Sequence, residues 1–223
     1  VLLDEEYEIF KSNVLANKNI FKQGYSSFET TIMFDNPNPK FTFYSEQVDG
    51  RLRLRTSKLH ESDIFKTIKL SEYSPTSMIT WKQRIPEYAN NDIRIEKEIE
   101  VHFESSESSQ MILILNEILK CPRISSYERI RETFYTNEIE VASDLFPYGH
   151  VVELELKSGN ESSLLELAEL LGLKTMKRSR LSCDDLYKLL CKKASIDSNS
   201  DILFSDKAMP KINDYLESIV SYL

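Results

Sequence analysis

Glycine and proline are scarce in this chain of 223 residues, which contains 5 Gly and 7 Pro. So little of either excludes a collagen-like protein, and a hydrophobic content of 41% excludes a chain that is disordered throughout. No apolar run approaches the ~20 residues of a membrane-spanning helix, so we expect a soluble protein with no membrane partner. The length suits one large domain that can bury a core.

Cysteine is also rare, and an odd number at wide spacing supports neither a disulfide framework nor a zinc site; the three are Cys121, Cys183 and Cys191. We therefore predict a reducing, cytoplasmic setting. No histidine has a Cys or His partner at ligand spacing, so all are interpreted as structural. The chain starts at Val1 without a basic segment before an apolar stretch, which predicts no signal peptide.

Positive charge is in deficit. The 28 Lys and Arg residues against 36 Asp and Glu give a formal net charge of −8. General nucleic-acid binding requires a basic surface that displaces counterions, so no nucleic-acid partner is expected. A local basic site remains compatible with this composition.

Charged and aliphatic residues alternate with period two along much of the chain. In Arg51-Leu52-Arg53-Leu54-Arg55 the alternation places the arginines on one face of a strand and the leucines on the other. The same pattern predicts strands at 78–84, 96–101, 129–131 and 151–157. A strand at 28–34, a turn at 35–39 and a second strand at 41–47 precede them.

Helices are predicted by apolar spacing in four segments, 4–21, 109–119, 162–171 and 183–193, the third closed by Gly172. A polar break at 195–201 precedes an amphipathic helix at 210–223. We interpret residues 1–193 as one domain and residues 194–223 as a C-terminal helical appendage.

The charged rows have two interpretations. An ordinary antiparallel sheet with one solvated face alternates in this way. Alternatively, the sheet closes into a barrel, helices cover its aliphatic side and the ionic rows face a hydrated lumen. Rows that are almost purely ionic and segregated by strand favour the barrel. Converging Arg and Lys suit adjacent phosphate groups, and carboxylates among them suit Mg²⁺ or Mn²⁺, which indicates phosphoryl transfer.

Six motifs occur in an order that resembles the CYTH superfamily, the triphosphate tunnel metalloenzymes. That group includes class IV adenylyl cyclases, thiamine triphosphatases and inorganic triphosphatases. The motifs are Phe34-Asp35-Asn36-Pro37, Arg51-Leu52-Arg53-Leu54-Arg55, Trp81-Lys82, Lys97-Glu98-Ile99-Glu100-Val101, Glu128-Arg129-Ile130-Arg131-Glu132-Thr133-Phe134 and Val152-Glu153-Leu154-Glu155. The similarity extends over about residues 25–190.

The resemblance implies an α+β fold, a closed antiparallel eight-stranded β-barrel with helices packed outside, whose tunnel holds a triphosphate and one or two divalent metals. By matching position it assigns phosphate binding to Arg53, Arg55, Lys82, Arg129, Arg131 and Arg180, with Lys82 and Arg131 as the catalytic residues. The metal ligands would be Glu98, Glu153 and Glu155.

The sequence departs from the family pattern twice. The family begins with a Glu-x-Glu-x-Lys strand, whereas the nearest segment here, at Glu6 to Lys11, carries its lysine one residue late and is predicted helical. We therefore expect that motif upstream of Val1. The family also has an Asp about ten residues before Val152-Glu153; that register holds Ser143, so either Asp144 substitutes or a carboxylate is lost.

Three functions stay open. The first is metal-dependent hydrolysis of inorganic triphosphate, a nucleoside triphosphate or thiamine triphosphate, with Mg²⁺ or Mn²⁺ as the cofactor. The second is a class IV type adenylyl cyclase. The third is a module that binds triphosphate or polyphosphate without turnover. A homodimer is also left open.

Overall fold

A computed structural model describes residues 1–45, 48–67, 76–85, 95–179 and 181–222. The strands are β1 Gln23–Phe34, β2 Gly50–Leu59, β3 Ser77–Arg84, β4 Glu96–Phe103, β5 Arg123–Tyr135, β6 Ile139–Phe146, β7 Gly149–Leu156 and β8 Asp201–Ile202. The helices are α1 Asp4–Ala16, α2 Asp63–Thr67, α3 Ser108–Leu113, α4 Glu161–Leu170, α5 Cys183–Ala194 and α6 Ile212–Ile219. A π-helical turn, Ile114–Ile118, extends α3, and short 3₁₀ turns lie at Lys18–Ile20, Ser105–Glu107 and Val220–Tyr222. None of these helices is long and apolar enough to span a bilayer.

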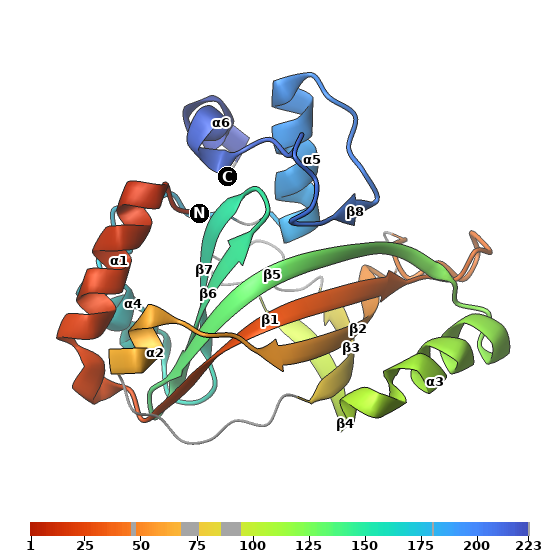
Figure 1. Ribbon diagram of the computed structural model, residues 1–223, viewed down its shortest axis with the longest axis horizontal. Helices are drawn as coiled ribbons and strands as arrows, with labels where there is room; N and C mark the ends of the chain where they lie inside the picture. The colour runs from red at the N-terminus through yellow and green to blue at the C-terminus, as the bar shows by residue number, and fades with distance from the viewer. Residues whose placement is uncertain (46–47, 68–75, 86–94, 180, 223) are drawn as a thin grey trace.

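The sheet is antiparallel and open. Its order is β4-β3-β2-β1-β5-β6-β7, with β8 added to β5 in parallel over two residues. Figure 1 shows the long strands β1 and β5 crossing the molecule, with the β6–β7 hairpin beside them. Between the described residues of the edge strands β4 and β7 no pairing occurs, so the closed barrel predicted from the sequence is wrong. The twist of neighbouring strands curls the sheet into a half-barrel without joining its edges.

The register brings the charged rows onto one face of the sheet, which we call the charged face. Arg53 lies opposite Thr80 on β3 and Met33 on β1. Farther along, Arg129 lies opposite Glu29, and Arg131 lies opposite Asp144. Side chains alternate along each strand, so a residue two or four positions from any of these also has its side chain on the charged face.

Helices cover much of the opposite, aliphatic face. Over β1 to β3, Leu54 and Phe34 are fully buried in a cluster with Leu115, which follows α3. Over β5 to β7, Phe134 and Val141 are buried against α1 and α4. The aliphatic rows therefore pack beneath helices, as the barrel interpretation predicted.

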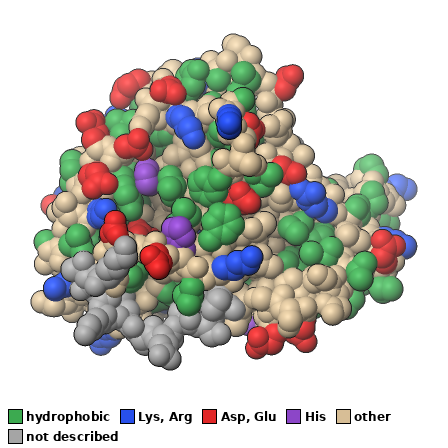
Figure 2. Space-filling model, viewed as in Figure 1, with side chains coloured by type: hydrophobic (Ala, Val, Ile, Leu, Met, Phe, Trp, Pro, Cys, Tyr) green, Lys and Arg blue, Asp and Glu red, His purple; other side chains and the backbone are tan. Residues whose placement is uncertain are grey.

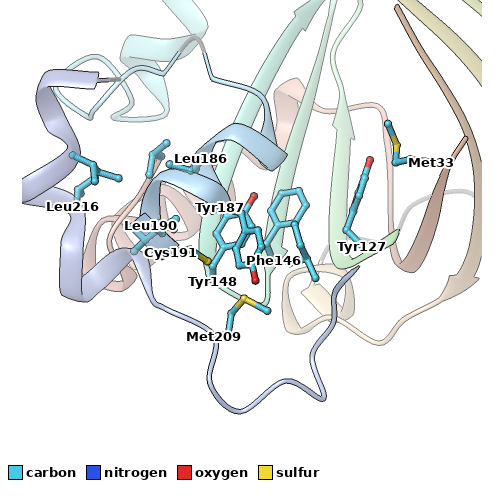
Figure 3. Packing of buried hydrophobic residues seen from close by; sticks show 14 residues of the cluster. Met33, Tyr127, Phe146, Tyr148, Leu186, Tyr187, Leu190, Cys191, Met209 and Leu216 are labelled. Atoms are coloured by element: carbon cyan, nitrogen blue, oxygen red, sulfur yellow. The ribbon is translucent and has the colours of Figure 1, made fainter. Parts of the chain in front are cut away.

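A third cluster closes one end of the charged face. Figure 3 shows Phe146 and Tyr148 beside Tyr187 of α5, with Tyr127 and Met33 extending the same cluster along the sheet away from that helix. Helix α6 belongs to the same cluster through the buried side chains of its apolar face, Ile212, Leu216 and Ile219. The segment that the sequence separates at 194 thus contributes a helix to this core.

Three local predictions need correction. Helix 4–21 ends at Ala16, and strand 28–34 begins earlier, at Gln23. The predicted strand 41–47 is wrong over its described residues, which form turns. The reason is Asp35: its carboxylate accepts the N–H of Phe43 at 2.7 Å and the hydroxyl of Thr42 at 2.6 Å, so the chain folds around this side chain instead of extending. Residues 46–47 lie outside the described residues.

The helix ends follow sequence signals. Asn160 caps α4 by accepting the N–H groups of Ser162 and Ser163, and Ser182 caps α5 by accepting that of Asp185. Gly172 follows α4 with φ at +77°, the left-handed conformation that glycine adopts without strain. The predicted ends of these two helices agree with the structure within one residue.

Candidate phosphate-binding site

The arginines of β2 are directed onto the charged face and are mostly buried. The side chains of Arg51, Arg53 and Arg55 are 15%, 15% and 11% exposed. In all three the Nε–H has no hydrogen-bond partner among the described residues. A buried guanidinium with free donors suits an anionic ligand, because an unmade hydrogen bond to a charged group is costly. The sequence prediction for Arg53 and Arg55 is compatible with this placement.

Two arginines of β5 form a buried ionic network. Arg131 makes a bidentate contact with Asp144, at 2.7 Å from Nε and 2.6 Å from Nη2. Arg129 contacts the same carboxylate at 3.0 Å and bonds Glu29 at 2.8 Å through Nε. Asp144 is fully buried, so these arginines are fixed before any ligand arrives.

The β5–β6 register shows on which face of the sheet Ser143 and Asp144 lie. Asp144 is on the charged face, whereas Ser143 is on the opposite face, where it lies across from Glu132 and Val152. Of the two residues, Asp144 is thus the one whose carboxylate lies among the arginines of the charged face. Both of its oxygens are engaged by arginines.

Glu29 was not singled out from the sequence. It is 3% exposed and bonds Arg129, with Arg55 Nε at 3.4 Å from its Oε2. Burial alone would raise the pKa of Glu29, but the arginines outweigh it and hold the pKa below its usual range. Because Glu29, Thr31 and Met33 alternate along one strand, the sequence could have indicated that the Glu29 side chain lies on the same face as the other two.

The depressed pKa of Glu29 predicts a loss of stability in acid. A carboxylate whose pKa is lower in the folded state stabilises the protein above its unfolded pKa, about 4.3, and loses that contribution as the pH falls. Urea unfolding between pH 7 and pH 3 should show a steeper decline for the natural protein than for Glu29→Gln. Parallel pH profiles for the two proteins would contradict the assignment.

Lys82 and the carboxylates of β4 form a more open group. Lys82 Nζ lies 2.8 Å from Glu98 Oε1, and Arg53 Nη2 lies 3.8 Å from the same oxygen. Burial alone would raise the pKa of Glu98, but the hydrogen bond and the positive charge of Lys82 outweigh burial, so the pKa is lowered overall. The pKa of Glu100 is raised, first by burial and then by Glu98. The pKa values of the two neighbouring carboxylates are thus shifted in opposite directions.

The predicted metal ligands do not gather in one place. Glu98 lies on edge strand β4, whereas Glu153 and Glu155 lie on the other edge strand, β7. Glu153 contacts Arg131 at 3.2 Å, and Glu155 contacts Lys157 at 2.8 Å. Within the described part of the chain, no three His, Cys, Asp or Glu side chains are grouped to hold a metal.

A hard divalent cation nevertheless fits the β4 carboxylates. Mg²⁺ binds through one or two carboxylates together with waters and substrate phosphates, and does not require a cage made by the protein alone. Glu98 and Glu100 are two residues apart on the same face of β4, and Glu98 raises the pKa of Glu100, a like-charge repulsion that a bound cation would relieve. Glu98 and Glu100 are therefore candidate ligands for such a cation on the β4 side of this face.

The start of α5 borders the charged face. Burial raises the pKa of the Cys183 thiol to about 12, with Glu153 and Asp144 adding to the effect. Tyr127 accepts a hydrogen bond from Arg53 at 3.4 Å. Cys183, Tyr127 and the Arg51–Glu96 ion pair belong to this site and were not predicted as part of it. Arg180, which was predicted, lies outside the described residues.

Solved structures share this arrangement of strands. PH1819 of Pyrococcus horikoshii OT3 aligns over 86% of this chain and 95% of its own, with 18% identity and a TM-score of 0.55. HpAC1 of Hippeastrum, a candidate adenylyl cyclase with a dominant triphosphatase activity, aligns over 89% and 94%, with 12% identity and a TM-score of 0.54. The chain has the fold of the CYTH superfamily.

A candidate adenylate cyclase from Vibrio parahaemolyticus aligns over 79% of this chain and 88% of its own, with 16% identity and a TM-score of 0.52. No family model matches the sequence, and neither does any curated protein. At these identities the comparison concerns the fold. The chemistry of this CYTH-like chain depends on the side chains of its own charged face.

Proposed function

We propose that the charged face binds a triphosphate-bearing substrate and hydrolyses it with the help of Mg²⁺ or Mn²⁺. The observation that supports this most is the row of buried β2 guanidinium groups beside Lys82, in which the Nε–H groups of Arg51 and Arg53 make no hydrogen bond to the described residues. Adjacent phosphates carry enough negative charge and acceptor oxygens to engage such a row. Catalysis of this kind depends mainly on positioning and charge neutralisation.

The basic side chains of the charged face differ in how firmly other residues hold them. Arg129 and Arg131 are locked on Asp144 and Glu29, so they would supply a fixed positive field. Arg53, Arg55 and Lys82 retain donors that can turn to a ligand. Glu98 and Glu100 would hold the metal, which when bound neutralises phosphate charge and lowers the pKa of a coordinated water. The metal roles of Glu153 and Glu155 stay predictions.

Phosphate release tests the proposal. Inorganic triphosphate, ATP and thiamine triphosphate are each incubated with Mg²⁺ or Mn²⁺, and free phosphate is measured with malachite green. We expect metal-dependent release of phosphate from at least one of these substrates. Saturable binding of triphosphate in calorimetry without release would instead identify a binding module, and neither release nor binding would overturn the proposal.

Cyclisation is the second candidate, because two proteins of this fold are described as candidate adenylyl cyclases. Chromatography of the products from ATP separates the two reactions. A hydrolase yields ADP or AMP, whereas a cyclase yields cyclic AMP and pyrophosphate.

Glu98→Gln is expected to raise the Mn²⁺ concentration for half-maximal release by about tenfold or more, because a neutral amide is a poor ligand for a hard cation. The control is Glu169→Gln, in an exposed ion pair with Lys174. An unchanged metal dependence in Glu98→Gln would remove this residue from the metal site.

A further inference from the structure

A second pocket lies on the opposite side of the sheet from the charged face. Its volume is about 210 Å³, and its walls are α1, the segment before α2 and the outer sides of β5, β6 and β7. Figure 2 views the molecule from this side, where histidine and acidic side chains border hydrophobic ones. At about 30 Å³ per water the space would hold about seven waters, which suits a small molecule.

Glu132 makes this pocket unusual. It is 8% exposed, and its two carboxylate oxygens accept hydrogen bonds from Tyr7, at 3.0 Å, and from Ser62. Three acidic side chains are buried among the described residues, and the other two, Glu29 and Asp144, contact arginines. No Lys or Arg of the described chain lies within 4.0 Å of Glu132. A buried carboxylate without a cation is costly, since neutral donors compensate its charge only in part.

Nearby side chains do not supply the missing charge. Lys11 lines the pocket without contacting Glu132. His150 stacks on Tyr7 with 3.9 Å between ring centroids, and burial lowers its pKa despite Asp4 and Glu8, so it is neutral at neutral pH. Among the described residues its buried Nδ1 has no hydrogen-bond partner, and neither has the hydroxyl of Ser26, which lies directly across from Glu132 on β1.

The remaining floor is aliphatic. Ile130 and Leu145 lie opposite one another on β5 and β6, two residues along from Glu132 and Ser143, and all four line the pocket. The pocket therefore places an anionic group next to a hydrocarbon surface. A ligand that matches both has a positively charged end and a short apolar body.

We propose that this pocket binds a small organic cation, whose ammonium group pairs with Glu132 and whose hydrocarbon part packs on Ile130 and Leu145. The site is separate from the charged face, and its occupation does not depend on the function proposed for that face.

Calorimetric titration of the full chain with 3-methylbutylammonium chloride at pH 7 tests the proposal, with 3-methylbutan-1-ol as the neutral probe of the same shape. The ammonium should bind saturably and the alcohol about tenfold or more weakly, because a hydrogen bond to a charged group contributes about 1.5–3 kcal/mol. Glu132→Gln should weaken ammonium binding by a similar factor. Glu128→Gln, on the same strand and face but outside the pocket, should leave it unchanged.

Leu145→Trp provides a variant that keeps every charge. Leu145 is half-buried on the pocket floor, so an indole there should fill the space and abolish binding of the ammonium while the circular dichroism spectrum stays native. Equal binding of the two probes, unchanged binding in Glu132→Gln or in folded Leu145→Trp, or no saturable binding below about 10 mM would each overturn the proposal.

Discussion

Lys82→Ala is expected to lower the rate of phosphate release by about 100-fold or more while leaving the protein folded. Removing one well-placed donor to developing phosphate charge costs this much in comparable sites. The fold should tolerate the change because the Lys82 side chain is 21% exposed and its partner Glu98 keeps Arg53 at 3.8 Å. An ion pair this open contributes about 1 kcal/mol or less, which corresponds to a shift of about 2–4 °C or less in Tm.

The measurement is single-turnover phosphate release with saturating Mn²⁺, together with a thermal melt. Lys174→Ala is the matched control, because Lys174 forms an exposed ion pair with Glu169 at 3.0 Å. It should retain the natural rate and Tm. A Lys82→Ala protein that releases phosphate at the natural rate would remove the charged face from catalysis, whatever its metal dependence.

The orientation of the charged rows could be predicted because it is a local property. In Arg51-Leu52-Arg53-Leu54-Arg55 the alternation determines which side chains share a face, without knowledge of any other strand. The position of Lys82 beside this row follows from the same parity on β3, and β2 and β3 are neighbours in the sheet. Signals within one strand were therefore sufficient for Arg53, Arg55 and Lys82.

Pairing between strands could not be predicted in this way. Alternation alone does not tell which carboxylate meets Arg131, because a shift of two residues in the β5–β6 register preserves the face and changes the partner. The sequence thus placed Arg131 in a charged row as a phosphate-binding and catalytic residue, without a partner from another strand. In the structure Arg131 is 8% exposed and grips Asp144 at two points.

Closure of the barrel is a second property that no strand determines alone. It depends on whether the edges β4 and β7 meet, which is the sum of the twist and curl of every strand between them. At the β7 edge, the N–H of Leu2 donates to the carbonyl of His150 at 3.0 Å. The alternation of charged and aliphatic residues is compatible with a closed barrel and with the observed open sheet, so it could not distinguish them.

Asp144→Ala is expected to destabilise the protein by about 3–5 kcal/mol, because it leaves Arg129 and Arg131 buried with their charges partly uncompensated. For a chain of this size the corresponding fall in Tm is about 6–20 °C. Urea unfolding at pH 7 measures the loss directly. Glu155→Gln is the control, because Glu155 pairs with Lys157 while 51% exposed, and its loss should cost about 1 kcal/mol or less.

The same variant distinguishes two roles of the β5 arginines. If Arg129 and Arg131 stay fixed only while Asp144 holds them, a polyanion that binds the charged face should stabilise Asp144→Ala more than the natural protein, since it replaces the lost counter-charge. Tripolyphosphate added during the melt should therefore raise the Tm of Asp144→Ala by a larger increment. An equal or smaller increment would mean that these arginines support the sheet and do not contact the ligand, which would leave phosphate binding to Arg53, Arg55 and Lys82.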